Sequence, residues 1–238
     1  MSRDGRATAE LVAEHAERLS RGDLEGCGED ANRILDRVHR GESVEVLRPL
    51  FDAGDVECTK SLTFILSELG LRSIGTMGWL NVLLDYPDEY VRHYAIIAVQ
   101  HSGSLEDDEV VAKAISKIGD SRPVALAVTR FLALGSLRQI ATAVPLLDGD
   151  LGEAVAWLAG EDFGEWGRFS SHGGVVPLVA VAAAFRLRAL GDPAPLDALM
   201  EDDRELVGDA ARFVARFQPL PQAGRDILHR IARDSAGD

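Results

Sequence analysis

One stretch of the sequence has the pattern of two helices joined by a short turn, and much of the chain repeats it. Apolar residues recur at helical spacing from Trp79 to Leu84, and Tyr86-Pro87-Asp88 follows. Proline disfavours helix in the residue before it, and an aspartate carboxylate can accept the unpaired first-turn amides of the next helix. One stripe with a 3.6-residue period comes next, made of Val91, Tyr94, Ala95, Ala98 and Val99. Residues 79–103 therefore predict an antiparallel helix pair with one buried face.

Glycines mark the expected ends of the second helices. They follow the last apolar turn of each pair at separations of 33, 32, 25 and 31 residues, and they are Gly70, Gly103, Gly135, Gly160 and Gly191. Glycine commonly ends a helix because it adopts the left-handed conformation without steric cost. A recurring period of this kind indicates an array of helical repeats. We therefore expect an all-α chain with roughly thirteen helices in about six repeats.

The repeats are expected to occupy residues 43–217 of a single domain that spans residues 1–238. Residues 8–20 and 28–39 have the pattern of two amphipathic helices, so residues 1–42 should cap one end of the array. Beyond Pro219 and Pro221, residues 218–238 should supply a polar terminal helix that caps the other end, as repeat arrays require. Residues 160–174 interrupt the pattern.

The charge balance restricts the classes of partner. The chain carries 25 Lys and Arg residues against 39 Asp and Glu residues, a net charge of −14. Proteins that bind nucleic acid by its phosphates are expected to carry a basic stripe. Neither half is basic, since residues 1–120 hold 13 bases against 23 acids and residues 121–238 hold 12 against 16. Nucleic acid and anionic membranes are therefore disfavoured as partners.

Other features favour a cytoplasmic protein. The longest apolar run, from Val175 to Phe185, is shorter than the roughly 20 residues that span a bilayer. The first ten residues show no apolar signal segment. Cys27 and Cys58 are the only cysteines and suggest no disulfide framework.

Two segments resemble HEAT repeats. They are LLDYPDEYVRHYAIIAV and RALGDPAPLDALMEDDRELVGDAARFVARF, the second similar to a short HEAT-like variety rich in Ala and Gly-Asp. The resemblance covers roughly residues 43–217 and implies an α-solenoid, an elongated superhelix whose second helices line a concave face. Such faces mostly bind proteins, but the same fold class contains DNA glycosylases and lyases. The alternative is an irregular all-α bundle whose helices happen to end in glycine.

The interruption at residues 160–174 is rich in aromatic residues. Its three internal glycines disfavour a regular helix, while Phe163, Trp166 and Phe169 are too many aromatics for a flexible linker. An ordered, aromatic-rich loop on a rigid scaffold is a common place for recognition. The alternative is a degenerate repeat whose aromatics fill a packing gap.

Acidic residues surround this interruption, since no Lys or Arg lies between Arg138 and Arg168. Together with the aromatics they predict a partner-binding surface on the concave face, although a solvated helix face would look similar. Its expected members are Asp150, Glu153, Trp157, Glu161, Asp162, Phe163, Glu165, Trp166, Arg168 and Phe169. We expect a cationic protein partner, because complementary charge steers encounter. An immunity or antitoxin-like protein that masks a basic toxin would have this character, and so would a scaffold or a regulatory subunit.

Signals for catalysis are weak. The sequence has no GxGxxG or GxxxxGK[ST] phosphate loop and no HExxH, GxSxG or CxxC motif. Trp157, Glu161 and Arg168 could form the groove of a HEAT-like DNA glycosylase, but the neighbouring acids would repel phosphates. A lyase would need a bound pigment or a catalytic thiol at Cys58. The sequence therefore favours a protein that is not an enzyme and holds no metal or cofactor.

Overall fold

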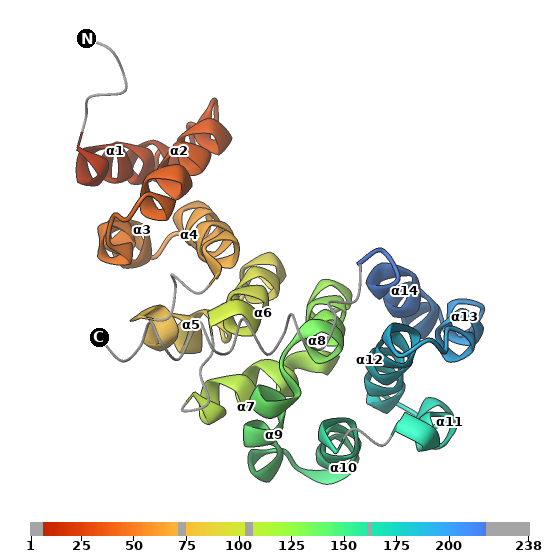
Figure 1. The fold of residues 1–238 in the computed structure, drawn as a ribbon. Coiled ribbons are helices and arrows are strands. Elements are labelled where there is room, and N and C mark those ends of the chain that lie inside the picture. The colour runs from red at the N-terminus through yellow and green to blue at the C-terminus, as the bar shows by residue number, and fades with distance from the viewer. Residues whose placement is uncertain (1–6, 71–74, 103–106, 161–162, 218–238) are drawn as a thin grey trace. The chain divides into compact units, whose positions relative to one another are not determined.

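The computed structural model describes residues 7–70, 75–102, 107–160 and 163–217 (Figure 1). These ranges contain fourteen α-helices with turns and short 3-10 helices between them, and they contain no β-strand. The prediction of an all-α fold is therefore confirmed. No helix within the same ranges has the length and apolar character needed to cross a membrane. The chain divides into two compact units, residues 1–103 (unit 1) and residues 104–238 (unit 2).

Unit 1 contains the first six α-helices. In chain order its elements are α1 (Thr8–Ser20), α2 (Cys27–His39), η2 (Val44–Leu47), α3 (Arg48–Ala53), α4 (Val56–Glu68), α5 (Met77–Leu83) and α6 (Glu89–Ser102). The two amphipathic helices predicted at residues 8–20 and 28–39 are confirmed. Helix α3 pairs with α4, α5 pairs with α6, and α4 packs along α6.

Aspartate side chains cap the N-termini of helices α4 and α6. Asp55 Oδ1 accepts a hydrogen bond from Cys58 N at 2.9 Å. Asp88 Oδ1 accepts from Tyr90 N at 2.9 Å and from Val91 N at 3.2 Å. These carboxylates satisfy first-turn amides that have no partner within the helix. The N-terminal cap predicted at Asp88 is confirmed.

The seam between α4 and α6 is the apolar core of unit 1. Leu62, Ile65 and Leu66 of α4 are fully buried, as are the residues of α6 expected on its inner stripe, except one. The exception is Tyr94, which is half-buried and meets the ring of Phe64 edge-on at 5.8 Å between ring centroids. Every α6 residue from Ala95 to Val99 is buried, so the inner face of α6 is wider than its sequence stripe.

Unit 2 contains the other eight α-helices. In chain order its elements are α7 (Asp108–Ser116), η4 (Lys117–Gly119), α8 (Arg122–Leu134), α9 (Leu137–Ala143), η5 (Val144–Leu146), α10 (Gly149–Ala159), η6 (Phe163–Glu165), α11 (Trp166–Ser170), α12 (Val176–Ala189), α13 (Ala194–Met200) and α14 (Glu205–Val214). Where glycines and aromatics interrupt the repeat pattern, the chain forms η6 and the short helix α11.

The described glycines expected to end helices have three different backbone conformations. Gly70 and Gly191 have positive φ angles of 58° and 100°, as a left-handed helix end requires. Gly135 follows α8 with extended backbone, and a Cβ added there would lie 2.6 Å from the Phe131 ring and carbonyl. Gly160 has right-handed helical backbone, and Gly103 lies outside the described residues. A left-handed end is therefore confirmed at two of the positions, and close approach accounts for Gly135.

Helix α12 has no polar face along most of its length. Every residue from Val176 to Arg186 is buried. A helix that is apolar on all sides has to be covered on all sides, and α8, α10, α11, α13 and α14 all pack against α12 (Figure 1). A regular ladder would place α10 between α8 and α12, but α8 packs directly on α12 and also on α14. Unit 2 is thus assembled around α12.

A buried arginine fastens α12 to the end of α8. Arg186 is 3% exposed, and its Nε and Nη2 donate to Leu132 O at 2.9 and 2.6 Å. Nη2 also donates to Gly135 O at 2.7 Å. The last carbonyls of a helix lack donors within the helix and form the negative end of its dipole, so a cation is favourable there.

Arginines also bind carbonyls at the turns inside two helix pairs. In the α5–α6 turn, Arg92 Nη1 donates to Tyr86 O at 2.7 Å and to Pro87 O at 2.8 Å. The residue that corresponds to Arg92 in α14 is Gly208, which has no side chain to do this. Arg212, one helical turn later, donates from Nη1 to Met200 O at 2.6 Å.

Gly208 gives Arg212 the space that it needs. A Cβ added at residue 208 would lie 3.1 Å from both terminal guanidinium nitrogens of Arg212 and 3.0 Å from Asp202 O. A Cβ at residue 208 would therefore require the guanidinium group and the turn backbone to shift by a few tenths of an ångström. The absence of a side chain at residue 208 therefore leaves room for Arg212, one turn later, to bind the turn.

We expect Gly208→Ala to destabilise the protein by about 1–3 kcal/mol through this overlap, although alanine normally favours a helix interior over glycine by about 1 kcal/mol. Urea unfolding followed by circular dichroism measures the effect. Gly28→Ala in α2 is the matched control, because nothing lies within 4 Å of a Cβ there. A gain in stability at Gly208 equal to that at Gly28 would contradict the assigned role of Gly208.

Candidate partner-binding surface

Helix α10 and the short helix α11 bring most of the predicted surface together. Glu153 and Trp157 lie one turn apart on α10, and Glu165, Trp166 and Arg168 lie in η6 and α11. The start of α10 packs tightly on the preceding turn, since a Cβ added at Gly152 would lie 2.4 Å from Leu147 O.

Aromatic rings join α10 to α11. The Trp157 and Phe169 rings stack with centroids 4.5 Å apart, and the Phe163 ring meets Trp157 edge-on at 6.5 Å. His172 stacks on Phe169 at 5.8 Å. Phe163 is 7% exposed and Phe169 is 3% exposed. Both phenylalanines are therefore buried in unit 2, where they pack on Trp157.

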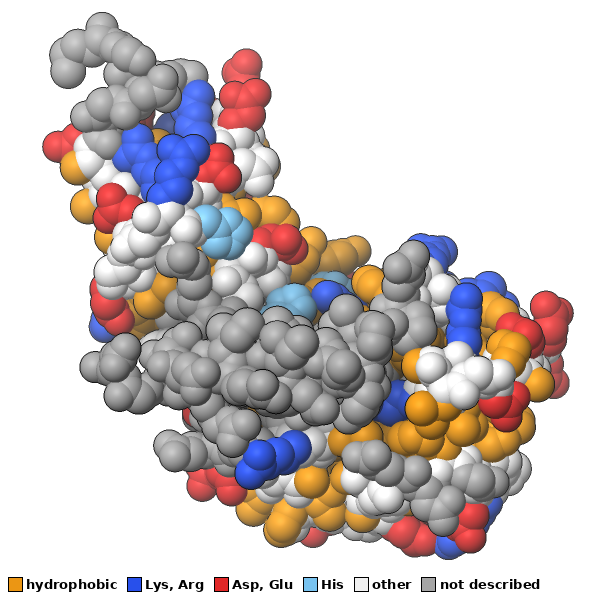
Figure 2. Space-filling model, in the orientation of Figure 1, with side chains coloured by type: hydrophobic (Ala, Val, Ile, Leu, Met, Phe, Trp, Pro, Cys, Tyr) orange, Lys and Arg blue, Asp and Glu red, His pale blue; other side chains and the backbone are white. Residues whose placement is uncertain are grey.

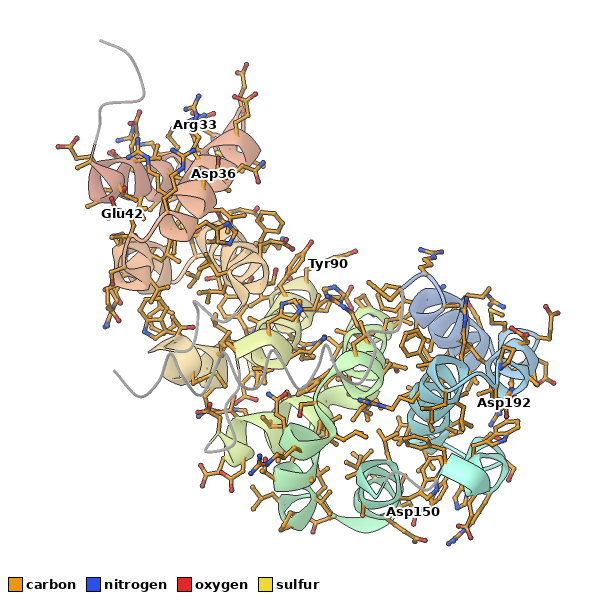
Figure 3. The ribbon with its side chains drawn as sticks, viewed as in Figure 1. Arg33, Asp36, Glu42, Tyr90, Asp150 and Asp192 are labelled. Carbon is orange, nitrogen blue, oxygen red and sulfur yellow. The ribbon has the colours of Figure 1, made fainter. Side chains whose placement is uncertain are left out.

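The remaining described members are accessible. Asp150, Glu153, Glu165 and Arg168 are exposed, and Trp157 and Trp166 are half-buried. We call these six residues the candidate surface. Asp150 lies in the first turn of α10 (Figure 3), where the helix dipole also favours an acid. In Figure 2, acidic side chains lie beside hydrophobic ones on unit 2. Glu161 and Asp162 lie outside the described residues.

Arg168 is held by the acids of the same surface. Its Nη2 lies 2.5 Å from Glu153 Oε1 and its Nη1 lies 3.4 Å from Glu165 Oε2. Its guanidinium carbon lies 5.1 Å from the centroid of the Phe169 ring, within range of a cation–π interaction. The side chains of all three charged residues are more than half exposed. Each pair therefore stabilises the fold by only about 0–1 kcal/mol.

The indole nitrogen of Trp157 is buried, and no described residue accepts a hydrogen bond from it. A buried donor without an acceptor costs about 1–3 kcal/mol. Packing against Phe169 and Phe163 needs only an aromatic ring, which phenylalanine would supply without this cost. The contacts among the described residues therefore account for an aromatic ring at this position but not for its indole N–H.

A second accessible aromatic group lies in unit 1, where the sequence analysis placed no site. Tyr90 is 54% exposed and its ring points away from α6 (Figure 3). His93 meets Tyr94 edge-on at 5.2 Å, and Tyr94 meets Phe64 of α4. In the sequence, the signal for this aromatic group is a second stripe on α6, made of Tyr90, His93 and Tyr94. It shares Tyr94 with the apolar stripe that predicts the core.

The residues considered for catalysis are placed as follows. Among the described residues no three His, Cys, Asp or Glu side chains are grouped to hold a metal ion. His172 Nδ1 lies 2.9 Å from the Arg168 carbonyl oxygen. Burial raises the pKa of the Cys58 thiol to about 11, so the reactive thiolate is scarce at neutral pH. The Trp157 ring packs on Phe169 and Phe163, and Arg168 forms ion pairs with Glu153 and Glu165.

No protein-family model matches the sequence, and a search of curated proteins finds no significant match.

We expect two substitutions of Trp157 to differ in their effect on stability. Trp157→Ala removes a ring that packs on two phenylalanines and should lower the free energy of unfolding by about 3 kcal/mol or more. Trp157→Phe keeps the stack and removes the unpaired donor, so stability should stay the same or rise. Thermal unfolding measures both changes. Equal losses in the two variants would mean that the indole N–H has an acceptor.

Proposed function

We propose that this protein is a non-enzymatic binding module, built of HEAT-like helix pairs, that binds a cationic protein through the candidate surface. The observation that carries the proposal is the combination on that surface of two half-buried tryptophans with three exposed acids. Tryptophan is enriched among the residues that dominate interface energies. The one base on the surface, Arg168, is already engaged by two of the acids.

The proposed HEAT-like architecture is supported by how helices pair within each unit. In unit 1, α3 lies beside α4 and α5 beside α6, and the second helices α4 and α6 pack on each other. In unit 2, α9 lies beside α10, α11 beside α12 and α13 beside α14. Neighbouring pairs that pack mainly on each other are characteristic of repeat proteins. The enclosure of α12 by five helices is the departure from that arrangement.

The charge distribution supports a cationic partner. The chain has a net charge of −14, and Arg168 is the only Lys or Arg between Arg138 and Arg186. An acidic surface around aromatic anchors attracts a basic partner over several ångströms and disfavours acidic ones. We propose that the protein acts in the cytoplasm, as an immunity or antitoxin-like protein, a scaffold or a regulatory subunit.

The proposal is tested by capture from native lysate on three immobilised proteins. These are the wild type, the site variant Glu153→Lys/Glu165→Lys, and the control variant Asp197→Lys/Glu201→Lys. The control changes two exposed acids of α13 and its C-terminal end, which are outside the candidate surface, and both variants alter the net charge equally. A basic protein retained by the wild type and the control but lost from the site variant supports the proposal. Equal retention by all three proteins contradicts it.

With the captured partner in hand, we expect the site variant to associate about tenfold more slowly than the control variant. Reversed charges at the contact oppose the encounter directly. Charges outside the contact act over longer distances, at which salt screens their effect. The association rate of the site variant should also depend less on salt concentration. Surface plasmon resonance over a range of salt concentrations measures both effects. Identical rates for the two variants would place the contact elsewhere.

Trp166→Ala should weaken the partner's affinity by about 2 kcal/mol, roughly thirtyfold, with little change in melting temperature. The half-buried ring of Trp166 at the start of α11 is available to a partner. Isothermal titration and thermal unfolding of the same preparation separate the two roles. A lower melting temperature with unchanged affinity would assign Trp166 to packing alone.

A further inference from the structure

In unit 1, a row of small polar groups lies between α1 and α4. Ser20 Oγ donates to Asp55 Oδ2 at 2.5 Å and lies 3.5 Å from Cys58 Sγ. Cys58 Sγ donates to Ala16 O at 3.4 Å. His15 Nε2 lies 2.8 Å from Ser61 Oγ. We call these contacts the polar seam. It differs from the neighbouring α4–α6 seam, where Leu62, Ile65 and Leu66 of α4 are fully buried.

His15 is the member of the polar seam that can change its charge near neutral pH. The side chain is 1% exposed, and only Nε2 has a hydrogen-bond partner. Nδ1 is buried, and no described residue forms a hydrogen bond with it. A neutral ring can leave Nδ1 as an unfilled acceptor, but a protonated ring carries an N–H on both nitrogens. The second N–H would be a buried, charged donor without an acceptor, which is strongly unfavourable.

The charged groups around His15 do not provide that acceptor. On α1 itself, Arg18 opposes a positive ring, and on α2 the carboxylate of Asp30 favours one. Asp30 is already bound by Arg18 at 2.7 Å and by Arg33 at 3.2 Å. From α4 the ring meets the hydroxyl of Ser61, and the nearby thiol of Cys58 is protonated at neutral pH. Burial is the largest influence, and it lowers the pKa of His15 below 6.5.

We propose that His15 is an acid-sensitive latch: a proton added to its ring opens the polar seam and releases the α1–α2 pair from α4, while α4 and α6 stay packed together. The inference concerns unit 1 and is independent of the partner-binding surface in unit 2. The direction follows from linkage. In the released state the ring is hydrated and has the ordinary pKa of 6.5, so below that pH the released state takes up protons more readily than the closed state. Closure is therefore strongest above pH 6.5 and weakens as the pH falls.

Amide hydrogen exchange tests the latch, with rates corrected for the pH dependence of the exchange chemistry itself. Between about pH 7.5 and about pH 5.5, the opening equilibrium of amides in α1 should rise by up to about tenfold, the limit for one group with a pKa of 6.5 in the open state. Amides in α6 and α12 should change much less. His15→Gln can still donate to Ser61 but cannot take up a proton, so this variant should lose the rise. His39→Gln replaces an exposed histidine at the end of α2 and should keep it.

Three results would overturn the latch. They are no rise in α1, an equal rise in α1, α4 and α6, and a rise that persists in His15→Gln. If His15→Gln does not fold, the wild type still decides the question through an NMR titration of the His15 ring. A ring pKa below 6.5 with opening confined to α1 and α2 supports the latch, and a ring pKa at or above 6.5 refutes it.

Discussion

A helix without a polar face must be enclosed, and unit 2 is arranged to satisfy that requirement for α12. Each buried aliphatic side chain on such a helix contributes about 1.5–3 kcal/mol only if another helix removes it from water. Five helices do so around the buried run from Val176 to Arg186. The direct contact of α8 with α12 follows, because a strictly linear array would leave one side of α12 uncovered. The short helix α11, formed where glycines break the repeat pattern, is part of this cover.

Arginine guanidinium groups donate hydrogen bonds to carbonyl oxygens at helix ends and turns that this packing brings together. Arg186 binds the last carbonyls of α8 from a helix that lies more than fifty residues later in the chain. Arg92 and Arg212 do the same for turns close to them in sequence. The contacts of Arg92 and Arg212 are part-buried or exposed, whereas Leu132 O and Gly135 O are bound in a buried place, where a carbonyl without a donor would cost about 1–3 kcal/mol. Arg186 offsets that cost and also fixes the orientation of the helix that carries it.

The sequence predicts what is local and leaves open what depends on long-range packing. The cap at Asp88, the helices at residues 8–20 and 28–39 and the all-α class follow from periodicity and capping chemistry. The central place of α12 does not, because a repeat ladder treats every pair alike. The apolar run from Val175 to Phe185 is the available signal, and its length excludes a membrane span without showing which helices enclose it. The carbonyl contacts of Arg92 could not be predicted either, since a charge off the apolar stripe usually faces solvent.

The candidate surface was predicted by residue type but not by burial, and this difference has a physical cause. Composition shows that Phe163, Trp166 and Phe169 lie among acids, whereas the direction of each ring depends on η6 and α11, which the three glycines made difficult to predict. Two phenylalanines turned inward and stacked with Trp157, and Trp166 stayed partly accessible. Packing alone would be served by phenylalanine at all of these positions. Among the described residues, none accepts a hydrogen bond from the buried indole N–H of Trp157. The direction of each ring, and with it which residues stay accessible, therefore depends on packing that residue types alone do not specify.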